Sequence, residues 1–279
     1  MESDEKTVLY YFTGTGNSLW AARELSKNMD DCEIISIANI MKNSPESIKP
    51  DATRVGIVCP VYAGGFPEIV AGFAEKLDLS DSRYTFLLAT FAGAGESIFA
   101  QYSKILKKKS KKLDGGFYVV MPNNYVCLFD VLPEDKETGT IEAAKSKIES
   151  VASAVLLEKK EIQKGHYITN FFNHKFYKRM IKNLHSMDSS FFADERCNGC
   201  RTCEAVCPVG NITVENGNPV WHHNCQYCYG CINFCPREAI QAGKGTQKKG
   251  RYHNREITVQ DMIDQRETAV ADNGRRGPE

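Results

Sequence analysis

This chain of 279 residues has neither an excess of charge of one sign nor a long apolar run. Its 35 lysine and arginine residues balance its 35 aspartate and glutamate residues, and nucleic-acid binding is not indicated. The longest apolar stretch, residues 84–95, is much shorter than the about 20 residues of a membrane-spanning helix, so we expect no membrane insertion. Residues 1–5 are acidic where a secretion signal is basic, and we therefore expect a cytoplasmic protein.

Two nucleotide-binding motifs and all histidine motifs are missing as well. The loop at residues 13–18 has no lysine where a GK[ST] phosphate loop requires one, which excludes a nucleoside-triphosphate site of that kind. It also has no third glycine for a dinucleotide fingerprint. None of the six histidines stands in a nucleophile or metal motif. Any catalysis should therefore belong to a bound cofactor.

Cysteine, in contrast, is abundant, with 11 residues. Eight of them form two copies of one motif that begin 28 residues apart, Cys197-x2-Cys200-x2-Cys203-x3-Cys207-Pro208 and Cys225-x2-Cys228-x2-Cys231-x3-Cys235-Pro236. Three thiolates at this spacing can hold three corners of an iron-sulfur cube, and the fourth comes from the other copy. The sequence therefore predicts two 4Fe-4S clusters, one held by Cys197, Cys200, Cys203 and Cys235, and the other by Cys225, Cys228, Cys231 and Cys207.

Zinc is the main alternative for these cysteines, because paired C-x2-C units often close tetrahedral zinc sites. Zinc would have no use for the third cysteine of each run, and a disulfide framework does not suit a chain whose thiols stay reduced inside the cell. The segment resembles bacterial two-cluster ferredoxins. Between the two copies we expect a hairpin that turns at Asn216-Gly217, with Trp221 as an apolar lid that excludes water from the clusters.

The first 160 residues alternate apolar runs with amphipathic stretches. Strands are expected at residues 7–12, 32–37, 54–60, 84–90 and 116–121. Helices are expected at residues 18–29, 67–76, 96–108 and 140–160. This pattern is typical of an α/β fold with a doubly wound, parallel, five-stranded sheet, in which ligands bind outside the carboxyl ends of the strands.

The loop after the first expected strand looks like a phosphate cradle. It reads Thr13, Gly14, Thr15, Gly16, Asn17 and Ser18, between a strand and the start of a helix. Its hydroxyl groups, together with the free backbone N–H groups at a helix N-terminus, can bind a phosphate dianion without a neighbouring cation. The spacing resembles the FMN phosphate loop of flavodoxins. An ordinary helix cap is the alternative.

Three further loops place aromatic residues or glycines where a flavin would bind. A flavin ring needs a flat apolar partner on its face and close backbone approach at its edge. The expected FMN contacts in these loops are Pro60, Val61, Tyr62, Ala63 and Gly64, then Phe91, Ala92, Gly93 and Gly95, then Asn124 and Tyr125. Tyr62 is the leading candidate for stacking on the flavin, Tyr125 is the second, and simple loop packing is the alternative for either residue.

Over nearly its whole length the chain resembles the flavodoxin-ferredoxin fusion proteins of anaerobic bacteria and archaea. The resemblance implies a flavodoxin-like, FMN-binding domain at 1–160, a helical linker at 161–190, a small α+β ferredoxin domain with two 4Fe-4S clusters at 191–243, and a basic tail with a short helix at 244–279. Simple flavodoxins often place tryptophan and acidic residues where this chain has Tyr62 and glycines, so the reduction potential of a flavin cannot be carried over.

The expected function is electron transfer between the two clusters and FMN, and onward to redox partner proteins of the ferredoxin, reductase or hydrogenase type in anaerobic metabolism. Two alternatives stay open. One is a flavin-dependent reductase that acts on a small-molecule acceptor, such as a quinone, in the pocket around Tyr62, Gly93 and Tyr125. The other is an iron-sulfur redox sensor. The sequence does not indicate an oligomeric state.

Overall fold

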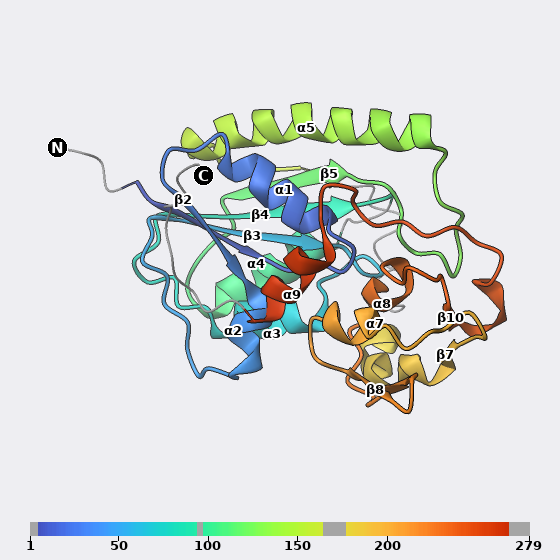
Figure 1. The fold of residues 1–279 in the computed structure, drawn as a ribbon. Helices are drawn as coiled ribbons and strands as arrows, with labels where there is room; N and C mark the ends of the chain where they lie inside the picture. The colour runs from blue at the N-terminus through green and yellow to red at the C-terminus, as the bar shows by residue number, and fades with distance from the viewer. Residues whose placement is uncertain (1–4, 94–96, 164–176, 268–279) are drawn as a thin grey trace, which may run out of the picture.

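The computed structural model describes residues 5–93, 97–163 and 177–267. A layered α/β structure occupies the first part of the chain, and a smaller unit of short strands and helices lies beside it (Figure 1). None of the helices in these residues has the length and apolar character that are required to cross a membrane.

A parallel six-stranded sheet forms the centre of the α/β part. Its strands are β1 (Thr7–Tyr11), β2 (Cys32–Ser36), β3 (Arg54–Pro60), β4 (Tyr84–Phe91), β5 (Gly115–Val120) and β6 (Glu161–Ile162). They lie in the order β2-β1-β3-β4-β5-β6. The first five strands confirm the predicted flavodoxin-like order. The predicted number of strands was wrong by one, because β6 pairs with the edge of β5 over two exposed residues and is too short to give a sequence pattern.

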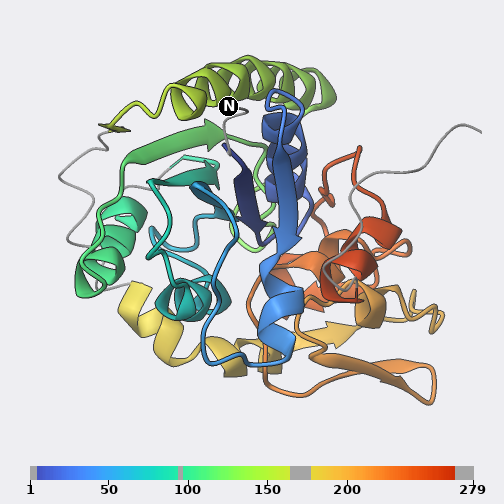
Figure 2. The same ribbon diagram turned by 90° about the vertical axis from the view of Figure 1, so that its left-hand side faces the viewer.

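Helices cover both faces of this sheet. Figures 1 and 2 show α1 (Asn17–Ser26) and α5 (Glu134–Leu156) on one face, and α3 (Glu68–Lys76) and α4 (Ile98–Lys108) on the other. Helix α5 begins earlier than predicted, because Pro133 precedes a first turn rich in carboxylates, which stabilise a helix N-terminus. A short helix that was not predicted, α2 (Ile37–Lys42), follows β2. The core therefore consists of two apolar layers, one on each side of the sheet.

The smaller unit is built around the two cysteine motifs. Its elements are β7 (Phe191–Ala193), α7 (Thr202–Ala205), β8 (Ile212–Glu215), β9 (Asn218–Trp221), α8 (Gly230–Asn233) and β10 (Ile240–Ala242). β8 and β9 form the predicted hairpin, with Asn216 and Gly217 at positive φ in its turn. β7 pairs with β10, so the residues before the first motif and those after the second lie side by side.

The segments that flank the smaller unit connect it to the α/β part. Before it, the predicted linker contains a 3-10 helix, η1 (Leu184–Ser190), while its residues 164–176 lie outside the described residues. After it come a 3-10 turn, η2 (Gly243–Gly245), and the predicted tail helix, α9 (Val259–Glu267), which packs against α2. Figure 1 shows α9 next to the smaller unit, in front of the sheet.

Candidate functional site

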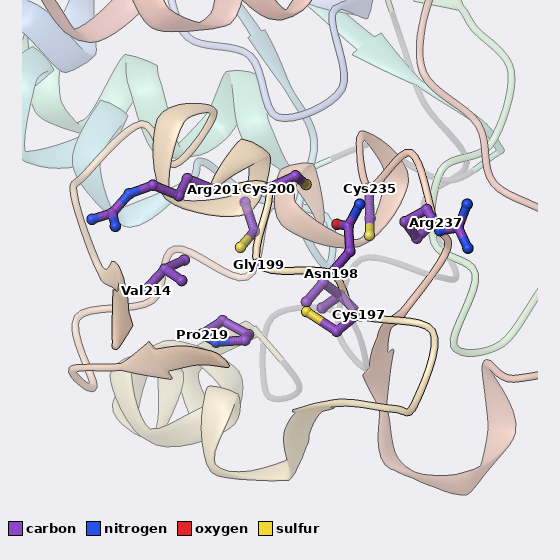
Figure 3. Close-up of a pocket in the computed structure, with 11 residues that line it drawn as sticks. Cys197, Asn198, Gly199, Cys200, Arg201, Val214, Pro219, Cys235 and Arg237 are labelled. Atoms are coloured by element: carbon purple, nitrogen blue, oxygen red, sulfur yellow. The ribbon is translucent and has the colours of Figure 1, made fainter. Parts of the chain in front are cut away.

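Four thiols of the predicted first set surround one hollow in the smaller unit. Cys197, Cys200, Cys203 and Cys235 all line it, so the fourth cysteine comes from the other copy of the motif. Figure 3 shows the hollow between the loops, with Arg201 and Arg237 on opposite sides of it. These thiols are not arranged around a single metal ion. Within residues 5–93, 97–163 and 177–267, no three Cys, His, Asp or Glu side chains lie close enough together to bind one.

The predicted second set surrounds another hollow. It is lined by Cys207 of the first copy and by Cys225, Cys228 and Cys231 of the second. Backbone N–H groups point at several of the eight sulfurs: Asn211 N donates to Cys207 Sγ at 3.2 Å, and Tyr227 N donates to Cys225 Sγ at 3.2 Å. Such donors favour thiolates, which are the form that binds iron.

The two hollows differ in their access to solvent. All four thiols of the second hollow are buried, whereas Cys200 of the first hollow is exposed and Cys197 is half-buried. Burial raises the pKa of Cys203 and of Cys228 to about 12, so these thiols are protonated without metal and metal binding has to release their protons. At Cys200, burial is outweighed by hydrogen bonds from Thr202, and its pKa lies below the usual value.

A cavity of about 510 Å3 lies where the α/β part meets the smaller unit, and we call it the shared cavity. Its wall includes the predicted residues Thr13, Gly14, Thr15, Asn17, Ser18, Pro60, Val61, Tyr62, Ala63, Phe91, Ala92, Gly93, Asn124 and Tyr125. These come from the loops after β1, β3, β4 and β5, which are the expected ligand loops of this fold. Gly16 and Gly64 do not line the cavity, and Gly95 lies outside the described residues.

Sequence reasoning missed the other residues of this wall: Thr90, Met121, Pro122, Asn123, Phe129, Met180, Met187, Tyr227 and Tyr229. Thr90 lies near the carboxyl end of a predicted strand, a position that could have pointed to it. Tyr227 and Tyr229 stand between cysteines of the second motif, and no local pattern places them near a loop some 200 residues earlier. Because of these two residues, the wall of the shared cavity is formed by both parts of the chain.

The loop after β1 is ordered by hydrogen bonds among its own side chains and its neighbours. Thr13 Oγ1 accepts from Gly16 N at 3.0 Å, Asn124 Nδ2 donates to Thr15 Oγ1 at 2.7 Å, and the Ser18 and Thr90 hydroxyls are 2.7 Å apart. Gly16, at φ 94°, precedes α1 and has no side chain to cap it. The first backbone N–H groups of α1 have no acceptor within the helix. The loop is thus arranged for an anion at the cavity wall.

The tail that follows the smaller unit also contacts the loop after β1. Thr13 N donates to Gln265 Oε1 at 2.8 Å, and Asn254 N donates to Thr15 O at 2.8 Å. Tyr252 Oη donates to Asn17 Oδ1 at 2.7 Å, while Tyr252 N donates to Asn233 Oδ1 of α8 at 3.0 Å. The tail therefore joins the loop after β1 to the smaller unit through buried hydrogen bonds.

The loop after β1 also contacts the second cysteine motif directly. A Cβ atom placed on Gly14 would lie 2.8 Å from Cys228 Cβ, and one placed on Gly230 would lie 2.8 Å from Gly14 O. Only glycine permits such an approach at both positions. Tyr229, the residue after Cys228, lines both the second hollow and the shared cavity. One side chain thus separates a candidate cluster site from a candidate flavin site.

Residues 190–256 match the family model of the 4Fe-4S dicluster domain. This match confirms the predicted pair of 4Fe-4S clusters in the second part of the chain. The matched range reaches into the tail and includes Tyr252 and Asn254, which contact the loop after β1. No curated protein matches the chain.

Several solved structures are similar to the α/β part. A putative flavoprotein of Bacteroides uniformis is 18% identical over 42% of this chain and 92% of that one, with a TM-score of 0.32. A two-electron reduced flavodoxin of Megasphaera elsdenii is 18% identical over 50% of this chain and 98% of that one, with a TM-score of 0.31. Rubredoxin oxygen:oxidoreductase of Desulfovibrio gigas is 13% identical over 54% and 37%, with a TM-score of 0.33. Because these scores are low, the flavodoxin-like fold is assigned from the strand order.

Proposed function

We propose that this protein transfers electrons between two 4Fe-4S clusters and an FMN molecule bound in the shared cavity. The observation that carries the proposal is the common wall: Tyr229 lines both the second hollow and the shared cavity, and Gly14 packs on Cys228. FMN would take up two electrons in single steps, whereas each cluster takes one, so the pair can connect one-electron carriers with two-electron chemistry.

The ligands of the first cluster in this proposal are Cys197, Cys200, Cys203 and Cys235, and those of the second are Cys207, Cys225, Cys228 and Cys231. Support comes from the grouping of the eight thiols around two hollows, four to each. The chemistry of the donors fits as well, because four thiolates are the usual ligands of a 4Fe-4S cluster.

FMN in this proposal lies with its phosphate on the loop after β1 and its ring among the loops after β3, β4 and β5. Thr13, Thr15 and Ser18 supply hydroxyl groups at one part of the wall. Aromatic side chains, among them Tyr62, Tyr125 and Tyr227, supply the apolar surfaces that a flavin ring requires at another. These residues bind and orient the flavin and exclude water from it.

The two clusters have different positions in the proposed path. The second is next to the shared cavity, and the first is nearer the surface, because Cys200 is exposed and Arg201 and Arg237 flank its hollow. A redox partner that exchanges single electrons would therefore meet the first cluster, and the second would connect it with the flavin.

Anaerobic purification followed by iron, sulfide and FMN analysis tests the cofactor content, and rapid one-electron reduction tests the path. We expect about eight iron atoms and one FMN per chain. After reduction, cluster bleaching should decay as the flavin is reduced, at a rate that does not change on dilution. A rate proportional to protein concentration would mean that electrons come from the clusters of another molecule.

A reductase that acts on a small molecule is the second candidate. It is favoured by the apolar side chains Phe129, Met180 and Met187 of the cavity wall, of which Met180 and Met187 extend the wall beyond the ligand loops of the sheet. Stopped-flow reoxidation of the reduced protein by quinones separates the two candidates. If quinones reoxidise it no faster than buffer does, the reductase candidate fails.

A further inference from the structure

Three buried donors near the second hollow have no hydrogen-bond partner among the described residues: Tyr62 Oη, Trp221 Nε1 and Tyr229 Oη. Burying such a group without a partner costs about 1–3 kcal/mol, and buried tyrosine and tryptophan side chains usually find an acceptor. None of the described residues that line the first hollow carries a donor of this kind. Among the described residues, Arg251 Nε is a further buried donor without a hydrogen-bond partner, and its charge interacts with Cys235 of the first hollow. The uncharged donors without a partner near the cysteines, in contrast, lie at the second hollow.

Tyr62 was predicted to stack on the flavin, but its hydroxyl points elsewhere. The ring lines the shared cavity, whereas Oη is inaccessible to solvent, which an oxygen facing that open cavity would not be. A single point, the Cβ position of an alanine at 14, lies 2.8 Å from Cys228 Cβ and 3.0 Å from Tyr62 Oη, so these two atoms are at most about 6 Å apart. A tyrosine hydroxyl has an ordinary pKa of about 10, so Oη carries a proton at neutral pH and can donate a hydrogen bond.

Trp221 was predicted to act as an apolar lid, and its position adds a polar function. It lines the second hollow together with the four thiols of that hollow. Its indole Nε1 can only donate a hydrogen bond, and no acceptor among the described residues serves it. Phe191 packs against the ring edge to face, with centroids 6.2 Å apart, which holds the indole in place.

Tyr229 differs from these two residues. Its hydroxyl lies within hydrogen-bonding reach of the Cys127 and Tyr227 side chains, which can serve as its partners. The donors that are left for the contents of the second hollow are Tyr62 Oη and Trp221 Nε1.

We propose that Tyr62 Oη and Trp221 Nε1 donate hydrogen bonds to sulfurs of the cluster held by Cys207, Cys225, Cys228 and Cys231, and thereby raise its reduction potential. This inference rests on the proposed function. The sign follows from charge: the reduced cluster carries one more negative charge than the oxidised cluster, so a donor to its sulfurs stabilises the reduced form more. Neither Tyr62 nor Trp221 lines the hollow of the cluster held by Cys197, Cys200, Cys203 and Cys235. The two donors thus favour an electron on the cluster next to the flavin.

Redox titration followed by EPR, on anaerobically prepared protein with both clusters and FMN, tests the inference with Tyr62→Phe and Trp221→Phe. In each variant we expect the potential of the second cluster to fall by about 59 mV, a tenfold change in the equilibrium between its reduced and oxidised forms. The first cluster is the internal reference and should not change. Cys235→Ser, which removes a ligand of the first cluster, assigns the two signals.

Tyr102→Phe is the matched control. Tyr102 is also fully buried, and its hydroxyl also has no hydrogen-bond partner in the part of the chain that the structure describes, but it lies in the core against Phe66 and lines neither hollow. Its loss should change neither potential. A fall of both potentials in Tyr62→Phe, or of neither, would overturn the inference for this residue, and the same criterion applies to Trp221→Phe.

Two further outcomes separate the inference from the proposed function. If Tyr62→Phe loses FMN while the potential of the second cluster stays unchanged, the hydroxyl serves the flavin and the inference is wrong. If the unmodified protein holds only one cluster or no FMN, the proposed function itself fails. Intact cofactors with unchanged cluster potentials would remove the inference alone.

Discussion

Replacing Gly14 with alanine tests whether the loop after β1 and the second cysteine motif form one packed unit. The added methyl group would lie 2.8 Å from Cys228 Cβ, 3.0 Å from Tyr62 Oη and closer still to the backbone carbonyl oxygen of Cys228. Because backbone atoms cannot rotate away, the two loops have to move apart. Overpacking of this kind costs about 1–3 kcal/mol, which is about 5- to 150-fold in an equilibrium constant.

We therefore expect Gly14→Ala to lower the free energy of unfolding by about 1–3 kcal/mol. Because the loop after β1 is displaced, we also expect weaker FMN binding and slower electron transfer from the clusters to FMN. Fluorescence titration measures the affinity, and rapid reduction followed optically measures the transfer. Gly139→Ala is the matched control, because a Cβ atom there meets nothing within 4 Å and alanine favours the interior of α5. Unchanged affinity and unchanged transfer in Gly14→Ala would refute the packed contact.

Four other variants have distinct expected outcomes. Cys207→Ser should damage the cluster of the second copy of the motif, and Cys235→Ser that of the first; EPR spectra in which each variant loses the cluster of its own copy would contradict the crossover. Thr13→Ala combined with Thr15→Ala should lower FMN affinity by about two orders of magnitude or more, since each hydrogen bond to a charged group contributes about 1.5–3 kcal/mol. Full retention of FMN through gel filtration and titration would show that these hydroxyls do not bind it. Tyr252→Phe leaves a buried Asn17 oxygen without its donor and should destabilise the protein by about 1–3 kcal/mol; an unchanged thermal midpoint would count against the role of the tail.

The centre of the sheet could be predicted because β1, β3 and β4 are buried along almost their whole length. Such strands have continuous apolar sequences, and β3 has the predicted bounds, Arg54–Pro60. The elements that were missed are short: α2 has six residues, and β6 has two exposed ones. Elements of this length are fixed by tertiary contacts, which a periodic pattern does not record.

The grouping of the cysteines could also be predicted. The local spacing groups three thiols in each copy of the motif, and the fourth is expected from the other copy in a two-cluster motif of this kind. The location of the second hollow beside the loop after β1 could not. It depends on contacts between Gly14 and Cys228, more than two hundred residues apart, and on the tail residue Gln265, which reads in the sequence as part of an ordinary polar helix. Tyr62 was identified as a site residue, but the direction of its hydroxyl could be learned only from the packed structure.

The two copies of the cysteine motif have a positive φ at the same two positions but carry different side chains there. The two copies therefore present different surfaces. Gly199 and Tyr227 are both at positive φ, 70° and 54°, and so are Arg201 and Tyr229, at 64° and 60°. In the first copy these positions carry a glycine beside the hairpin and an exposed arginine paired with Glu204.

In the second copy the same two positions carry tyrosines that face the shared cavity. Glycine would adopt a positive φ without strain, whereas a bulky residue in this region is strained by about 1–3 kcal/mol. The second copy tolerates that strain twice within three residues, at the wall between the second hollow and the shared cavity. Strain of this kind is common where function requires a particular side chain. The first copy of the motif thus presents a polar side chain to solvent, and the second copy presents aromatic side chains to the proposed flavin site.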